Sequence, residues 1–389
     1  MTDSIVIVSA RRTAIGSFQG QFAPVKSPEL GAAAIKAALT DAGIDGGDVS
    51  EVIMGCVLPA GVGQAPARQA SLGAGVPVST GCTTINKVCG SGMKAVIQGS
   101  DALLAGSADI VIAGGMESMS NAPYMAERGL RMGHAKFLDH MFFDGLQNPY
   151  DGQMMGQFGE NCVAKYGFTR DEQDAFSKAS VERALAAIES DAFGPEIAPV
   201  TVKTRKGEVE AATDEEPANC PIDKMAKLRP AFAKDGTITA ASSSKISDGA
   251  AATVLMRESD ASSRGLTPLA KIVAHATHSQ EPEWFTTAPV GAISKVLDKA
   301  GWKADEVDLF EINEAFATVT MAAMKELDLP HEKVNVNGGA CALGHPIGAS
   351  GARILVTLIH ALKARGGKRG IASLCIGGGE ATAIAVELV

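Results

Sequence analysis

The sequence has few aromatic residues and no cysteine pattern that would indicate disulfides or a structural metal site. Only 5% of its 389 residues are aromatic, and its seven cysteines are scattered without C-x-x-C spacing. An odd, scattered set argues against a disulfide framework or zinc site and is typical of a reducing compartment. No apolar run is long enough to span a bilayer, and residues 1–8 lack the features of a signal peptide. We therefore expect a cytoplasmic protein with no metal and no membrane partner.

Positive charge is also scarce. The 35 Lys and Arg residues are outnumbered by 44 Asp and Glu, which gives a formal net charge of −9. This balance argues against nucleic acid as a partner. With 46% hydrophobic residues, the chain has the composition of a globular protein, and its length predicts two or three domains.

Segments with strand and helix patterns alternate near the start of the chain. Residues 5–9 and 49–57 are apolar runs that predict buried strands. The segment 28–41 has the composition of a helix, and the Ala-Gly pair at 42–43 is a stop signal. This alternation predicts a sheet covered on both faces by helices, which is an α/β fold.

The same pattern recurs late in the chain. The Ala-Gly pair at 42–43 recurs 258 residues later at 300–301, and Gly-Ser-Gly at 90–92 recurs 259 residues later as Ala-Ser-Gly at 349–351. Two nearly equal offsets indicate two related α/β domains packed as a pseudo-symmetric pair. We interpret the polar segment 119–245 between them as an insertion that covers their shared site.

Two features of the inserted segment 119–245 are informative. A T-x-x-E capping box at 169–172 predicts the start of a helix through about residue 189. The run Lys-Thr-Arg-Lys-Gly-Glu at 203–208 predicts a basic hairpin turn. That turn is either a solvated surface turn or a contact for ligand phosphates.

Cys89 stands between a loop and a predicted helix that begins near Gly90-Ser91-Gly92. The glycines remove side-chain bulk beside the thiol, and Met93 and Val96 begin a 3.6-residue apolar period. Unpaired N–H groups at a helix N-terminus favour a thiolate, so we expect a lowered pKa and a nucleophilic cysteine. The alternative is a small buried hydrophobic residue.

Three later motifs favour the nucleophile. Asn313 follows the predicted strand 307–312, at the strand end where open α/β sheets place ligands. His345 stands between a glycine and a proline within the glycine-rich segment 337–351. Cys375 ends another predicted strand, and three glycines follow it with N–H groups able to serve as an oxyanion hole.

Taken together, these motifs resemble those of the thiolases. The resemblance rests on Cys-Gly-Ser-Gly at 89–92, Asn-Glu-Ala-Phe at 313–316, Gly-His-Pro-Ile-Gly at 344–348 and Cys-Ile-Gly-Gly-Gly at 375–379. It extends to Gly-Gly-Met-Glu-Ser-Met-Ser at 114–120 and Met-Ala-Lys-Leu-Arg-Pro at 225–230, and so covers the whole chain. Within the family, the pattern is most similar to the acetyl-CoA acetyltransferases.

The resemblance implies an α/β thiolase fold. In that fold two duplicated βαβαβαββ domains form five layers, α-β-α-β-α, and a loop domain is inserted in the first repeat. We expect the N-terminal domain at 1–118 plus 246–267, the inserted loop domain at 119–245 as a cover for CoA and the acyl pocket, and the C-terminal domain at 268–389.

The resemblance also implies catalytic roles. Cys89 would attack a thioester and hold the acyl group, and His345 would take its proton. Cys375 would act as general base and acid on the second acetyl-CoA, with a pKa nearer neutrality than that of an ordinary thiol. Asn313 would hold a water that stabilises the enolate oxygen together with His345, and the N–H groups of Cys89 and Gly377 would form a second oxyanion hole. Coenzyme A would be a substrate and product, with no permanently bound cofactor.

Substrate range is where the sequence departs from the family pattern. Met154 stands where many acetoacetyl-specific members carry histidine, Trp284 begins a stretch that is usually Met- and Gly-containing, and Cys341 replaces the common Ile or Val. We expect an acetyl-CoA acetyltransferase that forms acetoacetyl-CoA, with a broader 3-ketoacyl-CoA thiolase of fatty-acid β-oxidation as the alternative. The expected substrate-binding residues are Leu146, Met154, Met155, Ser244, Phe285, Ala315 and Phe316.

Other classes fit less well. A β-ketoacyl synthase would be expected to lack the second cysteine at 375, and a non-catalytic CoA-binding relative would have little reason to keep all four motifs. The glycines at 61 and 63 do not form G-x-G-x-x-G, which argues against a dinucleotide site. Residues 129–133 resemble the tetramer-forming loop of the family, so we expect a homotetramer.

Overall fold

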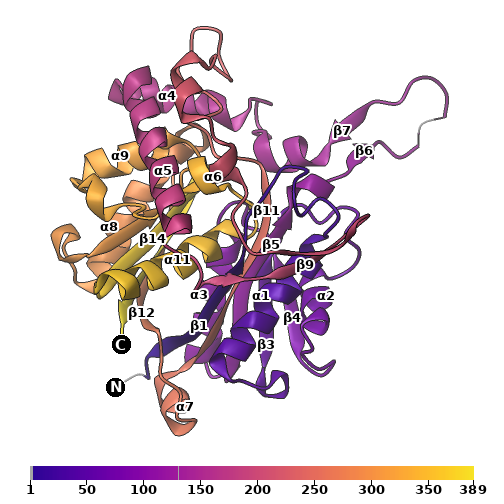
Figure 1. Cartoon of the computed structure of the whole chain (residues 1–389), viewed down its shortest axis with the longest axis vertical. Coiled ribbons are helices and arrows are strands. Elements are labelled where there is room, and N and C mark those ends of the chain that lie inside the picture. Colours follow the sequence, from indigo (N-terminus) through magenta and orange to yellow (C-terminus); the bar gives the residue numbers. More distant parts are fainter. Residues whose placement is uncertain (1–2, 130) are drawn as a thin grey trace.

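The computed structural model describes residues 3–129 and 131–389 (Figure 1). The N-terminal part of the chain, residues 5–257, builds one half of the main sheet, five adjacent strands in the order β1-β11-β5-β3-β4. β1 and β5 are antiparallel to β11, whereas β3 is parallel to both β5 and β4. These strands are β1 (Ile5–Thr13), β3 (Glu51–Gly55), β4 (Gly81–Ile85), β5 (Ile110–Ser118) and β11 (Ser247–Arg257).

The second half repeats these pairings. β12 and β14 are antiparallel to β15, β13 is parallel to β14, and an isolated parallel bridge from Phe310 to Val334 takes the place of the fifth strand. β1 and β12 join the two halves through two residue pairs, Val6 with Lys271 and Ile7 with Ala270. The strands of this half are β12 (Ala270–Ser279), β13 (Leu309–Ile312), β14 (Arg369–Ile376) and β15 (Glu380–Leu388).

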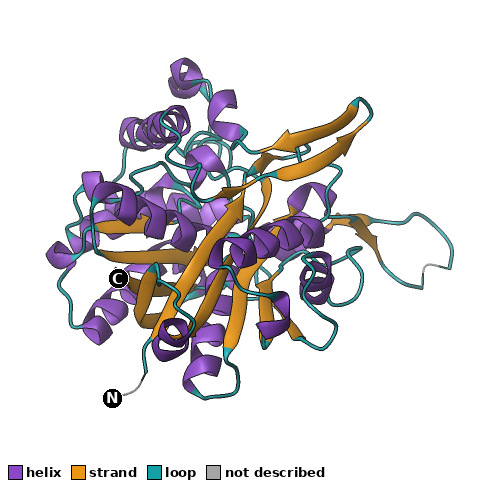
Figure 2. Cartoon of the chain, turned by 60° about the horizontal axis from the view of Figure 1, so that its bottom comes forward, coloured by secondary structure: helices purple, strands orange, loops and turns teal. Residues whose placement is uncertain are grey.

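Helices form three layers around the two half-sheets (Figures 1 and 2). One apolar core lies between the first half-sheet and α1, a second lies between the half-sheets around α3 and α11, and a third lies under α8. The order of layers is therefore α-β-α-β-α. The helices of these layers are α1 (Ser27–Ala42), α2 (Pro66–Gly73), α3 (Ser91–Leu104), α8 (Ala288–Ala300), α9 (Ala317–Leu327) and α11 (Ser350–Arg365).

Segment 119–245 holds most of the remaining elements, and in Figure 1 its β6–β7 hairpin projects away from the body. Its helices are α4 (Met155–Tyr166), α5 (Arg170–Glu189), α6 (Glu216–Asn219) and a π-helical turn (Met141–Leu146), and its strands are β6 (Tyr124–Ala126), β7 (Phe137–Asp139), β8 (Ile197–Ala198), β9 (Val200–Thr204) and β10 (Gly207–Ala211). Elsewhere lie β2 (Gly16–Ser17), α7 (Glu258–Ser263), α10 (Ala340–Leu343) and a 3-10 segment (Pro282–Thr287).

The duplication predicted from the sequence is confirmed at the helix ends. α1 ends at Gly43 and α8 at Gly301, and both glycines adopt the left-handed conformation, with φ of 64° and 67°. α3 begins at Ser91 and α11 at Ser350. The predicted capping box at the start of α5 and the predicted hairpin turn between β9 and β10 are also present.

The two central helices approach each other through glycines at equivalent positions of the repeats. A Cβ atom on Gly92 of α3 would lie 2.8 Å from the backbone nitrogen of Ala352. A Cβ on Gly351 of α11 would lie 2.5 Å from the backbone nitrogen of Met93. Both positions therefore require glycine, because any side chain would push the helices apart.

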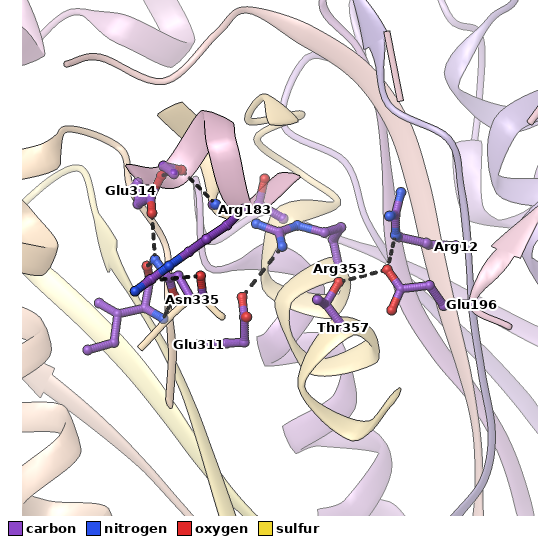
Figure 3. A network of polar contacts seen from close by, with 12 residues as sticks. Arg12, Arg183, Glu196, Glu311, Glu314, Asn335, Arg353 and Thr357 are labelled. Carbon is purple, nitrogen blue, oxygen red and sulfur yellow. Dashed lines mark hydrogen bonds and ion pairs between the residues drawn. The ribbon is translucent and has the colours of Figure 1, made fainter. Parts of the chain in front are cut away.

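A buried ionic cluster ties the segment 119–245 to both halves (Figure 3). Arg12 of β1 pairs with Glu196 at 2.5 Å and with both carboxylate oxygens of Asp214, at 2.7 and 2.9 Å. Glu196 also accepts the hydroxyl of Thr357 in α11 at 3.0 Å. The two carboxylates raise the pKa of Arg12 against the opposing effect of its burial.

Replacing Arg12 with methionine should destabilise the protein by about 3–5 kcal/mol, because Glu196 and Asp214 would remain buried without their counter-charge. The urea midpoint and the unfolding temperature measure this loss. Arg264, which pairs with Asp48 at the surface, provides the control: Arg264→Met should cost less than about 1 kcal/mol. Equal losses in the two variants would contradict a stabilising role for the buried cluster.

Candidate active site

Cys89 sits in a tight turn between β4 and α3. Val88 has a φ of 46°, a left-handed conformation that is costly for a β-branched residue and that turns the chain sharply just before the cysteine. Ser91 stabilises the turn, since its hydroxyl accepts the N–H of Lys87 at 2.8 Å and donates to the carbonyl of Val88 at 2.6 Å. The half-buried Cys89 is thereby held at the N-terminus of α3, as predicted.

His345 lies in the loop between α10 and α11, fully inside the protein. Its Nδ1 is 2.5 Å from the hydroxyl of Ser350, which itself donates to the carbonyl of Pro346 at 2.9 Å. The hydroxyl must therefore accept a hydrogen from Nδ1, which leaves the lone pair on Nε2. Asn313 Nδ2 is 3.5 Å from that Nε2. Burial, with the nearby charge of Arg353, lowers the pKa of His345 to about 3, so the imidazole is neutral and Nε2 can accept a proton.

Cys375 is buried at the end of β14, one residue before the turn that leads into β15. Gly378 and Gly379 of this turn have φ of 93° and 89°, conformations that other residues rarely adopt. The turn brings the N–H of Gly377 to the sulfur of Cys89, which also interacts with its own backbone N–H. Both N–H groups predicted to form an oxyanion hole therefore act on the sulfur of Cys89.

The expected low thiol pKa values are wrong. Burial raises the pKa of Cys89 to about 11, and the N–H groups of Gly377 and Cys89 only partly offset it. Burial, followed by the neighbouring Cys89, raises the pKa of Cys375 far above that of an ordinary thiol. The sequence shows the helix N-terminus but not the loss of water around it. Both thiols are therefore protonated at neutral pH and need a base, which the neutral His345 can supply.

Glu117, at the end of β5, belongs to the motif at 114–120, but the sequence did not predict its role in the site. Its buried carboxylate accepts the N–H groups of Val57 at 2.9 Å, Leu58 at 3.2 Å and Gly348 at 2.9 Å. Burial raises its pKa to about 7. Glu117 thus connects the loop after β3 to the loop that carries His345. The sequence signal for this role is an acidic residue at the end of an apolar strand.

Most of the expected substrate-binding residues surround the two cysteines. Phe285, Ala315 and Phe316 share an apolar cluster with Cys375, and Met155 packs against it. Leu146 and Cys89 pack against a second cluster formed by Val57, Leu58, Met119, Met141 and Ile347.

Two of the expected substrate-binding residues lie further out. Ser244 donates its backbone N–H to the carbonyl of Ala315 at 3.0 Å, which places it at the edge of the cluster around Cys375. Met154 is the N-cap of α4, and its backbone bridges to Gln147, outside both apolar clusters. Met154 therefore does not belong to the apolar cluster around either cysteine.

Comparison with known proteins agrees with this geometry. Residues 5–259 match the family model described as thiolase, N-terminal domain, and residues 266–388 match that of thiolase, C-terminal domain. The chain belongs to the thiolase family. Its predicted thiolase fold and its predicted identity as an acyltransferase are thereby confirmed.

Full-length relatives support the assignment. This thiolase is 51% identical over 385 residues to an acetyl-CoA acetyltransferase of Pseudomonas aeruginosa, covering 98% of each chain. It is 53% identical over 388 residues to one of Chromobacterium violaceum, covering 98% of this chain and 99% of the relative.

Two crystal structures are also similar. An acetyl-CoA acetyltransferase of Bacillus anthracis gives a TM-score of 0.97 at 42% identity, covering 100% of this chain and 99% of that one. A thiolase of Ascaris suum in complex with coenzyme A gives 0.95 at 43% identity, covering 99% and 100%.

Residues 3–129 and 131–389 contain neither a candidate membrane-spanning helix nor a candidate metal-ligand cluster. None of the helices there combines the length and apolar character needed to cross a membrane. Within the same ranges, no three His, Cys, Asp or Glu side chains gather as metal ligands. All seven cysteines of this thiolase are free.

Proposed function

We propose that this thiolase is an acetyl-CoA acetyltransferase that condenses two acetyl-CoA molecules reversibly to acetoacetyl-CoA and CoA. The observation that carries the proposal is the buried, neutral His345, whose Nε2 keeps its lone pair 3.5 Å from Nδ2 of Asn313, together with two protonated thiols and two backbone N–H donors at Cys89. Relatives at about half identity named acetyl-CoA acetyltransferase support the proposal.

The first half-reaction transfers an acetyl group to the enzyme. Nε2 of His345 takes the proton of Cys89 as its sulfur attacks the thioester carbonyl. The N–H groups of Cys89 and Gly377 stabilise the oxyanion of the tetrahedral intermediate. The carbon–sulfur bond to CoA then breaks, and the CoA thiolate takes the proton of Cys375 and leaves. Cys375 is thereby left as a thiolate, and Cys89 keeps the acetyl group.

The second half-reaction forms the new carbon–carbon bond. Cys375, as the thiolate, removes a proton from the methyl group of a second acetyl-CoA, and the resulting enolate oxygen is stabilised by His345 and by a water held at Asn313. Asn313 Oδ1 is buried without a hydrogen-bond partner among the described residues, which suits that role. The enolate carbon attacks the acetyl-Cys89 carbonyl, and the bond between that carbonyl and the Cys89 sulfur breaks. Cys89 takes back the proton held by His345, and acetoacetyl-CoA is released.

The preferred length of the acyl chain depends on the space beside Cys89. The apolar side chains of Leu58, Met141 and Ile347 pack beside Cys89, where a longer acyl chain would have to lie. We therefore expect a short acyl group and a preference for acetoacetyl-CoA.

The test is CoA-dependent cleavage of 3-ketoacyl-CoAs from four to sixteen carbons. The expected result is a kcat/KM for acetoacetyl-CoA at least about tenfold above that of the eight-carbon substrate, a ratio typical of hydrophobic pockets. Equal values from four carbons upward would instead favour the broader 3-ketoacyl-CoA thiolase. No turnover of any member of the series would refute the proposed function.

The inserted segment 119–245 is part of this proposal as the cover over bound CoA, between the N-terminal domain (1–118 plus 246–267) and the C-terminal domain (268–389). The CoA complex of the Ascaris suum thiolase supports coenzyme A as the ligand. The seven free cysteines, two of them proposed as catalytic, suit the reducing cytoplasm. Fatty-acid metabolism is the proposed context, because both substrate and product are short acyl-CoAs.

We also expect a homotetramer. β4 is an edge strand, paired only with β3 among the described strands, and such an edge can pair with a second copy. The β6–β7 hairpin exposes Tyr124 by 70% and Phe137 by 63%, and Met132 near its tip by 97%. The tetramer loop predicted at 129–133 lies at this tip, although Leu130 falls outside the described residues.

Light scattering of the parent protein should give four times the chain mass. The double variant that combines Tyr124→Ser and Phe137→Ser should give the mass of a dimer. A monomeric parent protein would contradict this expectation.

A further inference from the structure

Two turns from opposite halves of the chain meet at the oxyanion hole. The first, from Lys87 to Ser91, carries Cys89 and is closed by hydrogen bonds from Gly90 and Ser91 to the carbonyls of Lys87 and Val88, both at 3.0 Å. The second, from Ile376 to Glu380, carries Gly377 and joins β14 to β15. Since each turn supplies one N–H donor, their relative position sets the geometry of the hole.

Around the oxyanion hole, the turns contact each other through small and apolar groups. A Cβ atom on Gly90 would lie 2.4 Å from Cδ1 of Ile376, so any side chain at this position would displace the Ile376 side chain. A Cβ on Gly377 would meet Cγ1 of Val88 at 3.7 Å, an ordinary contact that leaves room for movement. Non-directional packing of this kind holds the turns together but does not fix how far one slides along the other.

One ion pair bridges the two turns. Lys87 Nζ pairs with Oε2 of Glu380, and the side chains are 22% and 32% exposed. The other carboxylate oxygen of Glu380 accepts the hydroxyl of Ser279 in β12 at 3.0 Å. Glu380 is therefore anchored to the sheet on one side and holds the Cys89 turn on the other.

We infer that Lys87 and Glu380 are positioning residues that fix the spacing between the N–H donors of Cys89 and Gly377, and so tune transition-state stabilisation in the proposed acetyl transfer. This inference rests on the proposed function. The pair is partly exposed, and neither Lys87 nor Glu380 is among the groups that act on the thiols of Cys89 and Cys375. A partly exposed ion pair contributes little to stability. An oxyanion-hole donor, in contrast, changes kcat by about 10²–10³-fold, so even a small displacement of one N–H donor should change kcat measurably.

The test compares Lys87→Met, Glu380→Gln and the reversed pair Lys87→Glu with Glu380→Lys in acetoacetyl-CoA cleavage. We expect each single variant to lower kcat about 5- to 30-fold, with KM changed less than about twofold, since a misplaced donor weakens the transition state more than substrate binding. The reversed pair, or Lys87→Arg if that pair does not fold, should recover kcat to within about threefold. The unfolding temperature should stay within about 3 °C of the parent protein.

Lys271, whose pair with Glu258 is similarly exposed but lies on β12 away from the turns, gives the matched control: Lys271→Met should leave kcat unchanged. A rise in KM at constant kcat would overturn the inference and point to a substrate contact. Unchanged kcat in both single variants would also overturn it. Losses of kcat that parallel a fall in unfolding temperature would do the same. If the parent protein itself fails to cleave acetoacetyl-CoA, the proposed function fails, which separates that outcome from failure of the positioning role.

Discussion

Cys89→Ala should abolish CoA-dependent cleavage of acetoacetyl-CoA, with a loss of at least about 10³-fold, because no other thiol can hold the acyl group beside the Gly377 N–H. Mass spectrometry after incubation with acetyl-CoA should show an acetylated peptide containing Cys89 in the parent protein and none in the variant.

A matched control separates this loss from general damage. Cys220 is partly buried and lies outside both clusters around the cysteines of the site, so Cys220→Ala should retain nearly full activity. If Cys89→Ala kept more than about one part in 10³ of the parent rate while folded, the covalent mechanism would have to be abandoned.

His345→Ala should lower acetyl transfer at pH 7 by about 10²–10⁴-fold and change its pH dependence. In the parent protein His345 stays neutral above its pKa of about 3, so the acylation rate should be nearly flat between pH 6 and 9. In the variant only the thiolate reacts, and the Cys89 pKa of about 11 means that the thiolate fraction grows with pH. The rate should then rise about tenfold per pH unit over the same range.

The measurement is single-turnover acylation by acetyl-CoA across that pH range. His331, which stacks on Phe176 away from the site, supplies the control, and His331→Ala should keep the flat profile. A flat, low profile in His345→Ala would show that His345 does not act as the base for Cys89.

The sequence predicted the architecture because its signals are local and repeated. The helix stops at Gly43 and Gly301 are short-range patterns. Each lies at nearly the same spacing from the next motif in its repeat, which reveals the duplication of the domain. Cys89 and His345 could be located for a related reason. Each stands beside glycines that permit close backbone approach, and such glycines are visible in the sequence.

What the sequence could not supply depends on contacts between distant residues. The pKa values of Cys89 and Cys375 follow from burial by side chains far along the chain. Arg12 meets Glu196 and Asp214 about two hundred residues away, and no local pattern predicts that pairing. The role of Glu117 likewise depends on N–H groups from two separate loops.

The reciprocal contact of Gly92 and Gly351 bears on how such a chain can originate. Each glycine faces the backbone beside its counterpart, so the contact is nearly symmetric about a two-fold axis. A single-repeat ancestor with one such glycine would make the same contact with a second copy of itself. Gene fusion then frees each copy to mutate separately, which allows the equivalent helix starts to diverge: one follows Cys89, and the other follows the loop that carries His345.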